Sequence, residues 1–398
     1  MHERTISSLL RNLGSAHQII VITGPRNSGK AALAKEVFPQ LPYVSFGNLN
    51  TGVQNNADLK NLIANYPEGA LFDKAQNISQ IAHDLEKILE SSPEKGLYIL
   101  VADQNPNVHI GVAQPLSSRI GLLTMLPPSL EEMGKLNTLD IETLNPEILK
   151  GNNPDLLASN SNLKVFNDYI GSIATMYPKY IKGKEEIAKF RMLGTLCALG
   201  IASSFKLSTL AKEVHLSPSR VRQWINILKA NYVLFFLKPF HQKSSKPYVK
   251  MSKLYFYDTG LACAFLGIRN ETELRNSKSY HALFKNIIIL EIMKKCINQG
   301  LDAAFYFWQE RRGRKIAFLA QLDNKLHIID IKPDPILQND YLHQLWYCID
   351  LCKTIPDISI MGYLIYTGQN SGKHLNITVL PLNKIGNMLE TISSAQKP

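Results

Sequence analysis

A glycine-rich loop that ends in lysine lies between an apolar run and a helical pattern near the start of the chain. The loop consists of Gly24, Pro25, Arg26, Asn27, Ser28, Gly29 and Lys30, and Ala31 follows it. Glycines let backbone N–H groups surround a polyphosphate, the following helix adds its dipole, and Lys30 brings a cation to the β and γ phosphates. The spacing therefore predicts a phosphate-binding loop with ATP as its ligand. A glycine-rich turn without a ligand is the alternative.

A magnesium ion would need oxygen ligands near this loop, and the sequence offers few. A serine or threonine hydroxyl after the lysine normally binds Mg²⁺, but Ala31 stands there. The apolar run 69–72 ends in Asp73, which we expect to bind Mg²⁺ indirectly and to act in catalysis. A glutamate after Asp73 would polarise the attacking water, but that position holds Lys74, which cannot act as a base while protonated. We therefore expect ATP binding to be kept better than hydrolysis.

Positive charge is concentrated in the middle of the chain. Residues 1–150 hold 12 Lys and Arg against 15 Asp and Glu, whereas residues 162–268 hold 16 against 5. A helix pattern at 205–214, a break ending in Ser217 and Pro218, and a second helix pattern predict a helix-turn-helix. We expect the second helix to offer four side chains to DNA: Ser219, Arg220, Arg222 and Gln223. The strand 232–237 and the basic loop 238–253 would form a wing; a winged helix that only joins domains is the alternative.

The elements that position these residues predict an α/β protein with three domains. Apolar runs at 19–22, 69–73 and 97–101 alternate with helical stretches at 31–38 and 78–89, which is typical of a parallel sheet covered by helices. We expect this domain to span 1–150, a basic winged-helix domain to span 162–268, and an α/β domain to span 269–398. An Asn- and Pro-rich linker is expected at about 145–162.

Composition limits the cellular setting and the chemistry. No run approaches the roughly 20 apolar residues of a membrane span, and residues 1–4 begin no signal-peptide pattern, so we expect a cytoplasmic protein without a membrane partner. The five cysteines form no CxxC pair, and we expect them to be reduced packing residues.

The order of several segments resembles prokaryotic AAA+ ATP-binding proteins that carry a C-terminal domain of unknown function. The resemblance rests on 21–38 with 41–46, on 98–105, on 116–119 with 126–130, and on 253–262, the last being the strongest match. It implies that Arg119 is a phosphate-sensing arginine, with an ordinary surface arginine as the alternative, and that Asp103 or Gln104 is the polar sensor. Some AAA+ relatives assemble into rings, so a homo-oligomer is possible.

The resemblance also implies a restriction-endonuclease-like fold for the last segment. In that fold a helix glutamate, a strand aspartate and an acid-x-lysine pair hold a divalent metal. Here Glu291, Asp330 and Lys332 match, but Lys285, Lys315 and Ala317 replace acidic residues. A missing central aspartate and nearby lysines disfavour a metal, so we expect a degenerate site without nuclease activity.

Three functions remain open at this point. The leading hypothesis is an ATP-binding AAA+ protein with weak or absent hydrolysis that acts as a nucleotide-responsive DNA- or partner-binding module. The second is a pseudo-enzyme scaffold with a vestigial phosphate loop, and an active ATP-dependent nuclease ranks last. Nucleotide affinity separates the first two hypotheses.

Overall fold

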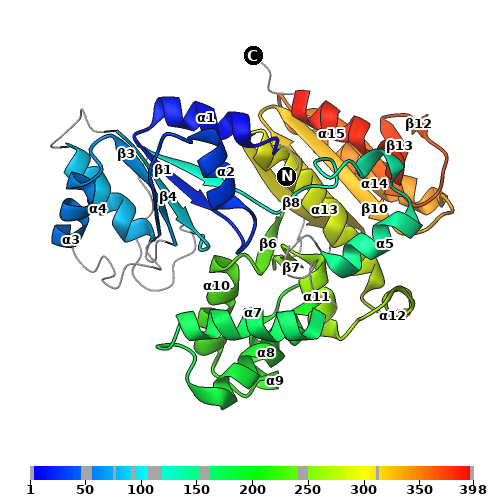
Figure 1. Cartoon of the computed structure of the whole chain (residues 1–398). Coiled ribbons are helices and arrows are strands. Elements are labelled where there is room, and N and C mark those ends of the chain that lie inside the picture. Colours follow the sequence, from blue (N-terminus) through cyan, green and yellow to red (C-terminus); the bar gives the residue numbers. More distant parts are fainter. Residues whose placement is uncertain are drawn as a thin grey trace. The chain divides into compact units, whose positions relative to one another are not determined.

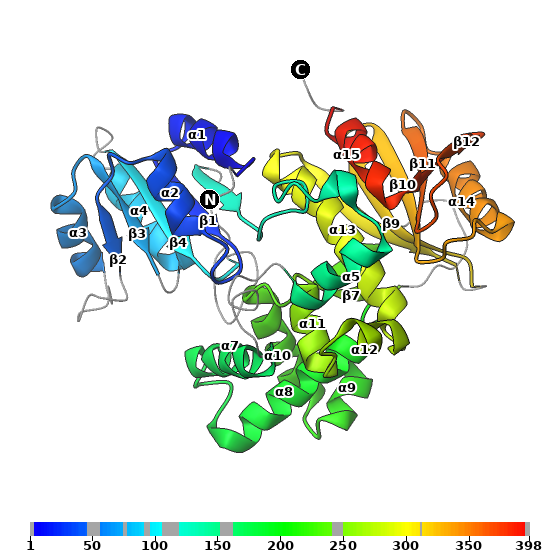
Figure 2. The ribbon, with the colours of Figure 1, turned by 45° about the vertical axis from the view of Figure 1, so that its right-hand side comes forward.

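A computed structural model describes residues 4–45, 56–74, 78–90, 96–105, 119–151, 162–240, 250–310 and 313–394 (Figures 1 and 2). The chain divides into two compact units. The first unit contains residues 1–127 and 222–233, and the second contains 128–221 and 234–398. Within the described residues, no helix is long and apolar enough to cross a membrane.

The first unit is built on a five-stranded parallel sheet. In spatial order its strands are β2 (Tyr43–Ser45), β3 (Gly69–Asp73), β4 (Leu97–Ala102), β1 (Ile19–Thr23) and β5 (Ile120–Thr124). Strand β1, next to the edge strand β5, pairs in parallel with both β4 and β5, so that Thr23 lies between Ala102 and Thr124. In open parallel sheets, ligands bind at the carboxyl ends of strands where the strand order reverses. The order of these strands therefore directs attention to the loop after β1.

Alternating side chains of β1 join two separate cores of this unit. Ile19 and Val21 pack in the core that includes residues of α3 (Asn56–Ala64) and α4 (Ile78–Glu90). Ile20 and Ile22 pack in the core formed with α1 (Ser7–Ala16) and α2 (Lys30–Val37). Burial on both faces explains why the strand reads as one continuous apolar run. The predicted parallel sheet covered by helices is confirmed.

The second unit contains an eight-stranded mixed sheet. Its spatial order is β12 (Gly372–His374), β13 (Ile377–Pro381), β11 (Ser359–Tyr366), β10 (Lys325–Lys332), β9 (Lys315–Leu322), β8 (Ala303–Gln309), β6 (Leu234–Pro239) and β7 (Lys253–Phe256). Residues Leu345, Cys348 and Cys352 of α14 (Asn339–Cys352) pack against one face in a core with strand residues. The unit also contains α13 (Tyr280–Asn298), which lies against β10, and α15 (Ile385–Ser393). An α/β fold in this part of the chain agrees with the prediction.

Helices dominate the remaining part of the chain. They are α5 (Ile141–Lys150), α7 (Asn162–Met176), α8 (Gly183–Leu199), α9 (Leu207–Glu213), α10 (Pro218–Ala230), α11 (Thr259–Leu266) and α12 (Glu271–Asn276), with short 3-10 helices at Leu136–Thr138 and Leu382–Lys384. The expected linker from about residue 145 was placed too early, because Asp140 caps α5 and this helix continues to Lys150. Residues 152–161 lie outside the described part of the chain.

The hairpin predicted as a wing is part of the large sheet. Strand β6 pairs antiparallel with β7 and, through Lys238 and Pro239, parallel with β8. Most of the expected basic wing loop, 241–249, lies outside the described residues. All five cysteines are buried and unbonded, as expected for packing residues.

Candidate functional site

The loop between β1 and α2 has the backbone that the phosphate-binding pattern predicts. Gly24 has φ 155°, and a Cβ atom there would lie 2.0 Å from the carbonyl oxygen of Met125. Gly29 has φ 89°, and Asn27 has φ 62°, a left-handed conformation that asparagine tolerates better than most residues. Arg4 donates from its guanidinium to the carbonyls of Ser28 (3.2 Å) and Leu126 (2.8 Å) and so ties the loop to the chain that follows β5.

Lys30 is the central cation of this loop, and it is buried. Its Nζ donates to the carbonyl oxygens of Pro25 (2.6 Å) and Gly24 (3.1 Å) and lies 2.8 Å from Oδ1 of Asp103. Burial lowers the pKa of Lys30, and the nearby carboxylates of Asp103 and Asp73 oppose that shift. Asp103 therefore serves as the counter-ion of Lys30, and an incoming phosphate would compete with it.

The carboxyl ends of β3 and β4 bring two aspartates to the same edge of the sheet as the loop. Asp73 ends β3, and Asp103 follows β4, which lies beside β1. The Asp73 carboxylate accepts hydrogen bonds from the hydroxyl of Tyr43 (2.7 Å) and the backbone N–H of Lys74 (2.8 Å). Gln104 takes part through its backbone, since its carbonyl accepts a hydrogen bond from Thr23. The sheet thus brings together Lys30, Asp73 and Asp103.

The groups around the loop fit the phosphates of a nucleotide. For Mg²⁺ they offer two carboxylates but no hydroxyl after Lys30. The ammonium group of Lys30 and the backbone N–H groups of the loop would hold the phosphates. Asp73 and Asp103 are the carboxylates available to a metal, whereas Ala31 has no hydroxyl. Because Mg²⁺ keeps several waters and often takes only one or two carboxylates beside phosphate oxygens, this set would suffice only with nucleotide bound.

Arg119 lies at the other end of the sheet. It precedes β5, whose Ile120 is level with Ile19, whereas the phosphate loop follows Thr23, level with Thr124. These two levels are four residues apart along the strand, a distance of about 13 Å. The Arg119 guanidinium is exposed and pairs with Glu90 at 2.7 Å. The structure thus does not bring Arg119 to the phosphate loop of its own chain.

The predicted helix pair exists as α9 and α10. Val221, Trp224, Ile225 and Leu228 are buried, as helical spacing predicts for a packing face. The candidate DNA contacts Ser219, Arg222 and Gln223 are exposed on α10.

Arg220, the fourth candidate contact, is already engaged. It forms an ion pair with Glu186 of α8 at 2.5 Å. The hydroxyl of Ser217 accepts from the backbone N–H of Arg220 (3.3 Å), in agreement with its predicted capping role.

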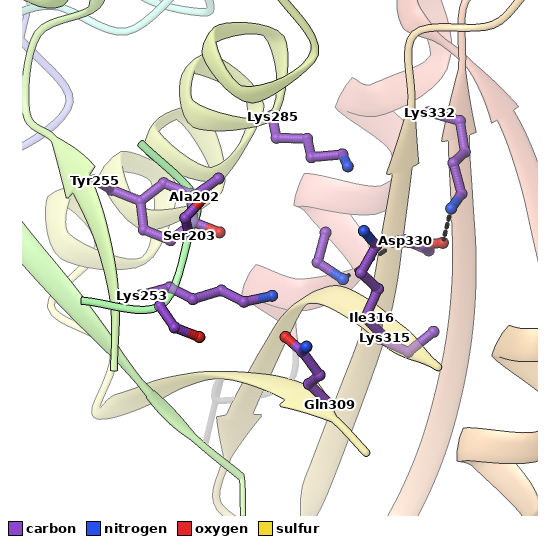
Figure 3. A pocket seen from close by; sticks show the side chains of 12 residues that line it. Ala202, Ser203, Lys253, Tyr255, Lys285, Gln309, Lys315, Ile316, Asp330 and Lys332 are labelled. Carbon is purple, nitrogen blue, oxygen red and sulfur yellow. Dashed lines mark hydrogen bonds and ion pairs between the residues drawn. The ribbon is translucent and has the colours of Figure 1, made fainter. Parts of the chain in front are cut away.

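The nuclease-like residues divide into two places in the second unit. Asp330 and Lys332 of β10 form an ion pair of 3.0 Å, and the backbone N–H of Ala317 donates to Asp330 (3.2 Å). They line a cavity of about 230 Å³ (Figure 3). Glu291 is not among its lining residues: its carboxylate accepts from the N–H of Leu130 (2.6 Å) and pairs with Lys294 (2.7 Å).

The residue of α13 that lines this cavity is Lys285. Six residues separate it from Glu291, which is a rotation of about 240° around the helix axis, so the two point in different directions. Lys253 and Lys315 also line the cavity. The sequence predicted Lys253 to lie in the basic wing loop and gave no sign that it lines a cavity. Its burial is hard to recognise from the sequence, because a lysine in a basic run is normally exposed.

Comparison with known proteins supports an AAA domain in the first unit. Residues 16–134 match the family model of an AAA domain. Residues 142–272 and 280–385 match models of two domains of unknown function, DUF8612 and DUF4143. Uncharacterized proteins of Mycobacterium bovis and Mycobacterium tuberculosis are each 20% identical over 337 residues, which is 83% of this chain and 74% of theirs.

Solved structures offer more distant likenesses. A Walker-type ATPase of Pyrococcus abyssi is 12% identical, with a TM-score of 0.41 over 67% of this chain and 96% of that one. The AMPPCP-bound DnaA of Aquifex aeolicus is 16% identical, with a TM-score of 0.28 over 56% of this chain and 85% of that one. With scores this low, the assignment rests on the AAA domain model and on the loop itself. Residues 16–134 therefore match an AAA domain, and the C-terminal part of the chain matches domains of unknown function.

Proposed function

We propose that this protein is a nucleotide-responsive binding module whose phosphate loop binds ATP with weak or absent hydrolysis and whose basic segment, residues 162–268, binds DNA. The observation that carries the nucleotide part is the position of Lys30. Its ammonium group is 4% exposed, is held by loop carbonyls, and has a carboxylate partner that a phosphate can replace. A buried cation kept in a preformed anion loop is costly unless an anion is bound there.

Weak hydrolysis follows from the groups around Asp73. The next side chain is Lys74, in a left-handed conformation with φ 57° and exposed to solvent. A protonated lysine cannot take a proton from water, and Ala31 removes the usual hydroxyl ligand of Mg²⁺. At the described positions next to Asp73 and Lys30, the usual base and the usual hydroxyl ligand for water attack are replaced, whereas the groups that bind phosphate are kept.

A response to nucleotide is supported by contacts within the first unit. The hydroxyl of Tyr232, just after α10, lies 3.2 Å from the hydroxyl of Thr23, the last residue of β1. The N–H of Asn105 donates to the carbonyl of Ala230 (2.7 Å), at the end of α10. The end of α10 thus contacts the end of β1, which leads into the loop of Lys30, and the segment after β4 that contains Asp103. Exposed Arg222 and Gln223 on the same helix are the proposed DNA contacts, made chiefly to phosphates.

Fluorescent ATP and ADP titrations, with and without Mg²⁺, test the nucleotide part. We expect Lys30→Ala to weaken ATP binding by at least about tenfold, because a charge-assisted contact to phosphate is lost. Lys87→Ala, which removes an exposed lysine from α4, should leave affinity unchanged. Phosphate release with Mg²⁺ should stay near background in the unmodified protein.

The same proteins separate this proposal from its alternative. ATP binding that is absent, or equal in the Lys30→Ala protein, would favour a scaffold with a vestigial loop. Duplex DNA affinity should change when ATP is added to the unmodified protein and should not change in the Lys30→Ala protein. DNA binding that ignores ATP in both would leave a protein partner as the target of the basic segment.

A further inference from the structure

The cavity that replaces the nuclease-like site is lined by an unusual set of charges. It lies within the second unit and is lined by residues of α13, β7, β8, β9 and β10 and of the segment 202–204. Figure 3 shows Lys285 entering from the helix and Lys253 from strand β7, with both side chains directed into the same space. Of the ionisable groups that line it, four are lysines, namely Lys253, Lys285, Lys315 and Lys332, and one is the carboxylate of Asp330. Tyr255 is the remaining titratable residue.

Only one of the four lysines has a carboxylate partner. Lys332 pairs with Asp330, whose other oxygen accepts from a backbone N–H. Within the described residues, Lys253, Lys285 and Lys315 form no hydrogen bond or ion pair with an acidic group. Lys253 is 7% exposed, and its Nζ lies over the ring of Phe307, 4.4 Å from the centroid.

Burial of like charges without counter-ions is unfavourable, and it lowers the pKa of two of the lysines. Burial, with repulsion from Lys315 and Lys285, lowers the pKa of Lys253 to about 8. Burial also lowers the pKa of Lys285, against the attraction of Asp330. An anion in the cavity would remove this penalty, because opposite charge favours the protonated form. A divalent cation would be repelled, and Ala317 gives it no ligand.

The size and charge of the cavity limit the kinds of anion that it can bind. At about 230 Å³ the cavity is smaller than the roughly 300–1,000 Å³ typical of pockets for drug-sized ligands. The enclosed part of the cavity therefore suits a phosphate group. Three unpaired ammonium groups favour a dianion over a carboxylate or a phosphodiester, which carry a single charge. The side chain of Gln309, which borders the space in Figure 3, and the hydroxyl of Ser203 supply neutral donors.

We propose that this lysine cavity, formed where a nuclease would hold its metal, binds a phosphomonoester dianion. The ligand is inorganic phosphate or the terminal phosphate of a nucleic acid strand. The inference concerns the second unit alone, and it does not depend on ATP binding at the phosphate loop.

Calorimetric titration of the full chain tests the proposal. The Lys30→Ala substitution is present in every sample, so that the phosphate loop contributes nothing. The probes are inorganic phosphate, a short oligonucleotide with a 5′-phosphate, and the same oligonucleotide with a 5′-hydroxyl. We expect Lys285→Gln and Lys315→Gln each to weaken phosphate binding roughly tenfold, as loss of a charged hydrogen bond implies. Lys373→Gln, at an exposed lysine of β12, removes the same charge and should have no effect.

The three probes distinguish the two sources of the phosphate group. Binding of inorganic phosphate alone supports a small-molecule source, and tighter binding of the 5′-phosphate strand than of its 5′-hydroxyl form supports recognition of a strand end. The proposal would be overturned if inorganic phosphate did not bind and the two oligonucleotides bound equally, or if Lys373→Gln weakened binding as much as Lys285→Gln and Lys315→Gln. Misfolding is controlled by thermal unfolding without ligand, in which removal of Lys285 or Lys315 should raise the midpoint, since repulsion is relieved.

Discussion

The two units treat buried basic groups in opposite ways. In the first unit, Lys30 is buried but is neutralised by Asp103 and by loop carbonyls. In the second unit, Lys253 is buried among other lysines, and His327 of β10 is fully buried with neither ring nitrogen hydrogen-bonded. The first arrangement is ready to exchange one anion for another. The second carries an electrostatic penalty that a ligand or a change of pH can relieve, and stability measurements can distinguish the two.

The largest expected effect is acid destabilisation through His327. Burial, with repulsion from Lys325, lowers the pKa of His327 from 6.5 to about 4. Between these values the unfolded chain binds a proton that the folded chain does not, so stability is complete above pH 6.5 and falls as pH decreases toward 4. The loss amounts to about 3 kcal/mol. Urea unfolding at several pH values measures it.

The matched variant for this prediction is His327→Leu. Its unfolding free energy should lose this pH-dependent component, whatever its value at pH 7.5. Equal slopes in the two proteins between pH 6.5 and 4 would show that His327 is protonated in the folded state without cost, and the contrast between the units would then rest on the lysines alone.

A somewhat smaller effect is expected at Lys253. Its pKa falls from 10.5 to about 8, so at neutral pH the folded chain bears the cost of a buried ammonium group, and this cost disappears as pH rises from 8 to 10.5. Lys253→Met removes the buried ammonium group and should therefore stabilise the protein at pH 7. We expect a gain of roughly 2 kcal/mol, which is less than the full cost of the ammonium group because methionine gives up the contact with Phe307. The advantage should vanish near pH 10.5. Destabilisation at pH 7 would show that Lys253 has a compensating partner.

The fold was readable from the sequence to a large extent, and the direction of individual side chains was not. Apolar runs such as 19–22 and 97–101 identify buried parallel strands because both faces are covered. The spacing from Gly24 to Lys30 identifies the loop because its glycines have a backbone role. By contrast, α13 is buried on most sides, including several of its polar residues, so its sequence does not reveal that Lys285 lines the cavity while Glu291 pairs with Lys294.

Arg119 shows the same limit for strand ends. The resemblance gave Arg119 a role but no place in the sheet, because the edge that it occupies depends on the register of β5 against β1. Asp103 was recognised only as a polar candidate, and its role as the partner of Lys30 required the neighbouring positions of β1 and β4. Such relations depend on tertiary packing, which local periodicity does not encode.

The smallest effect on stability, and the sharpest test of the comparison, is expected from Asp103→Asn. This change leaves Lys30 buried without its carboxylate, and we expect a loss of roughly 1–2 kcal/mol, less than for a fully buried pair because Asp103 is 45% exposed. ATP affinity should move the other way and rise several-fold, because phosphate no longer has to displace a carboxylate from Lys30. Thermal unfolding and fluorescent ATP titration measure the two quantities, and saturating ATP should restore the lost stability. If ATP affinity fell together with stability, Asp103 would be a group that helps to hold the nucleotide rather than one that competes with it, and the loop of the first unit would need both charges to work.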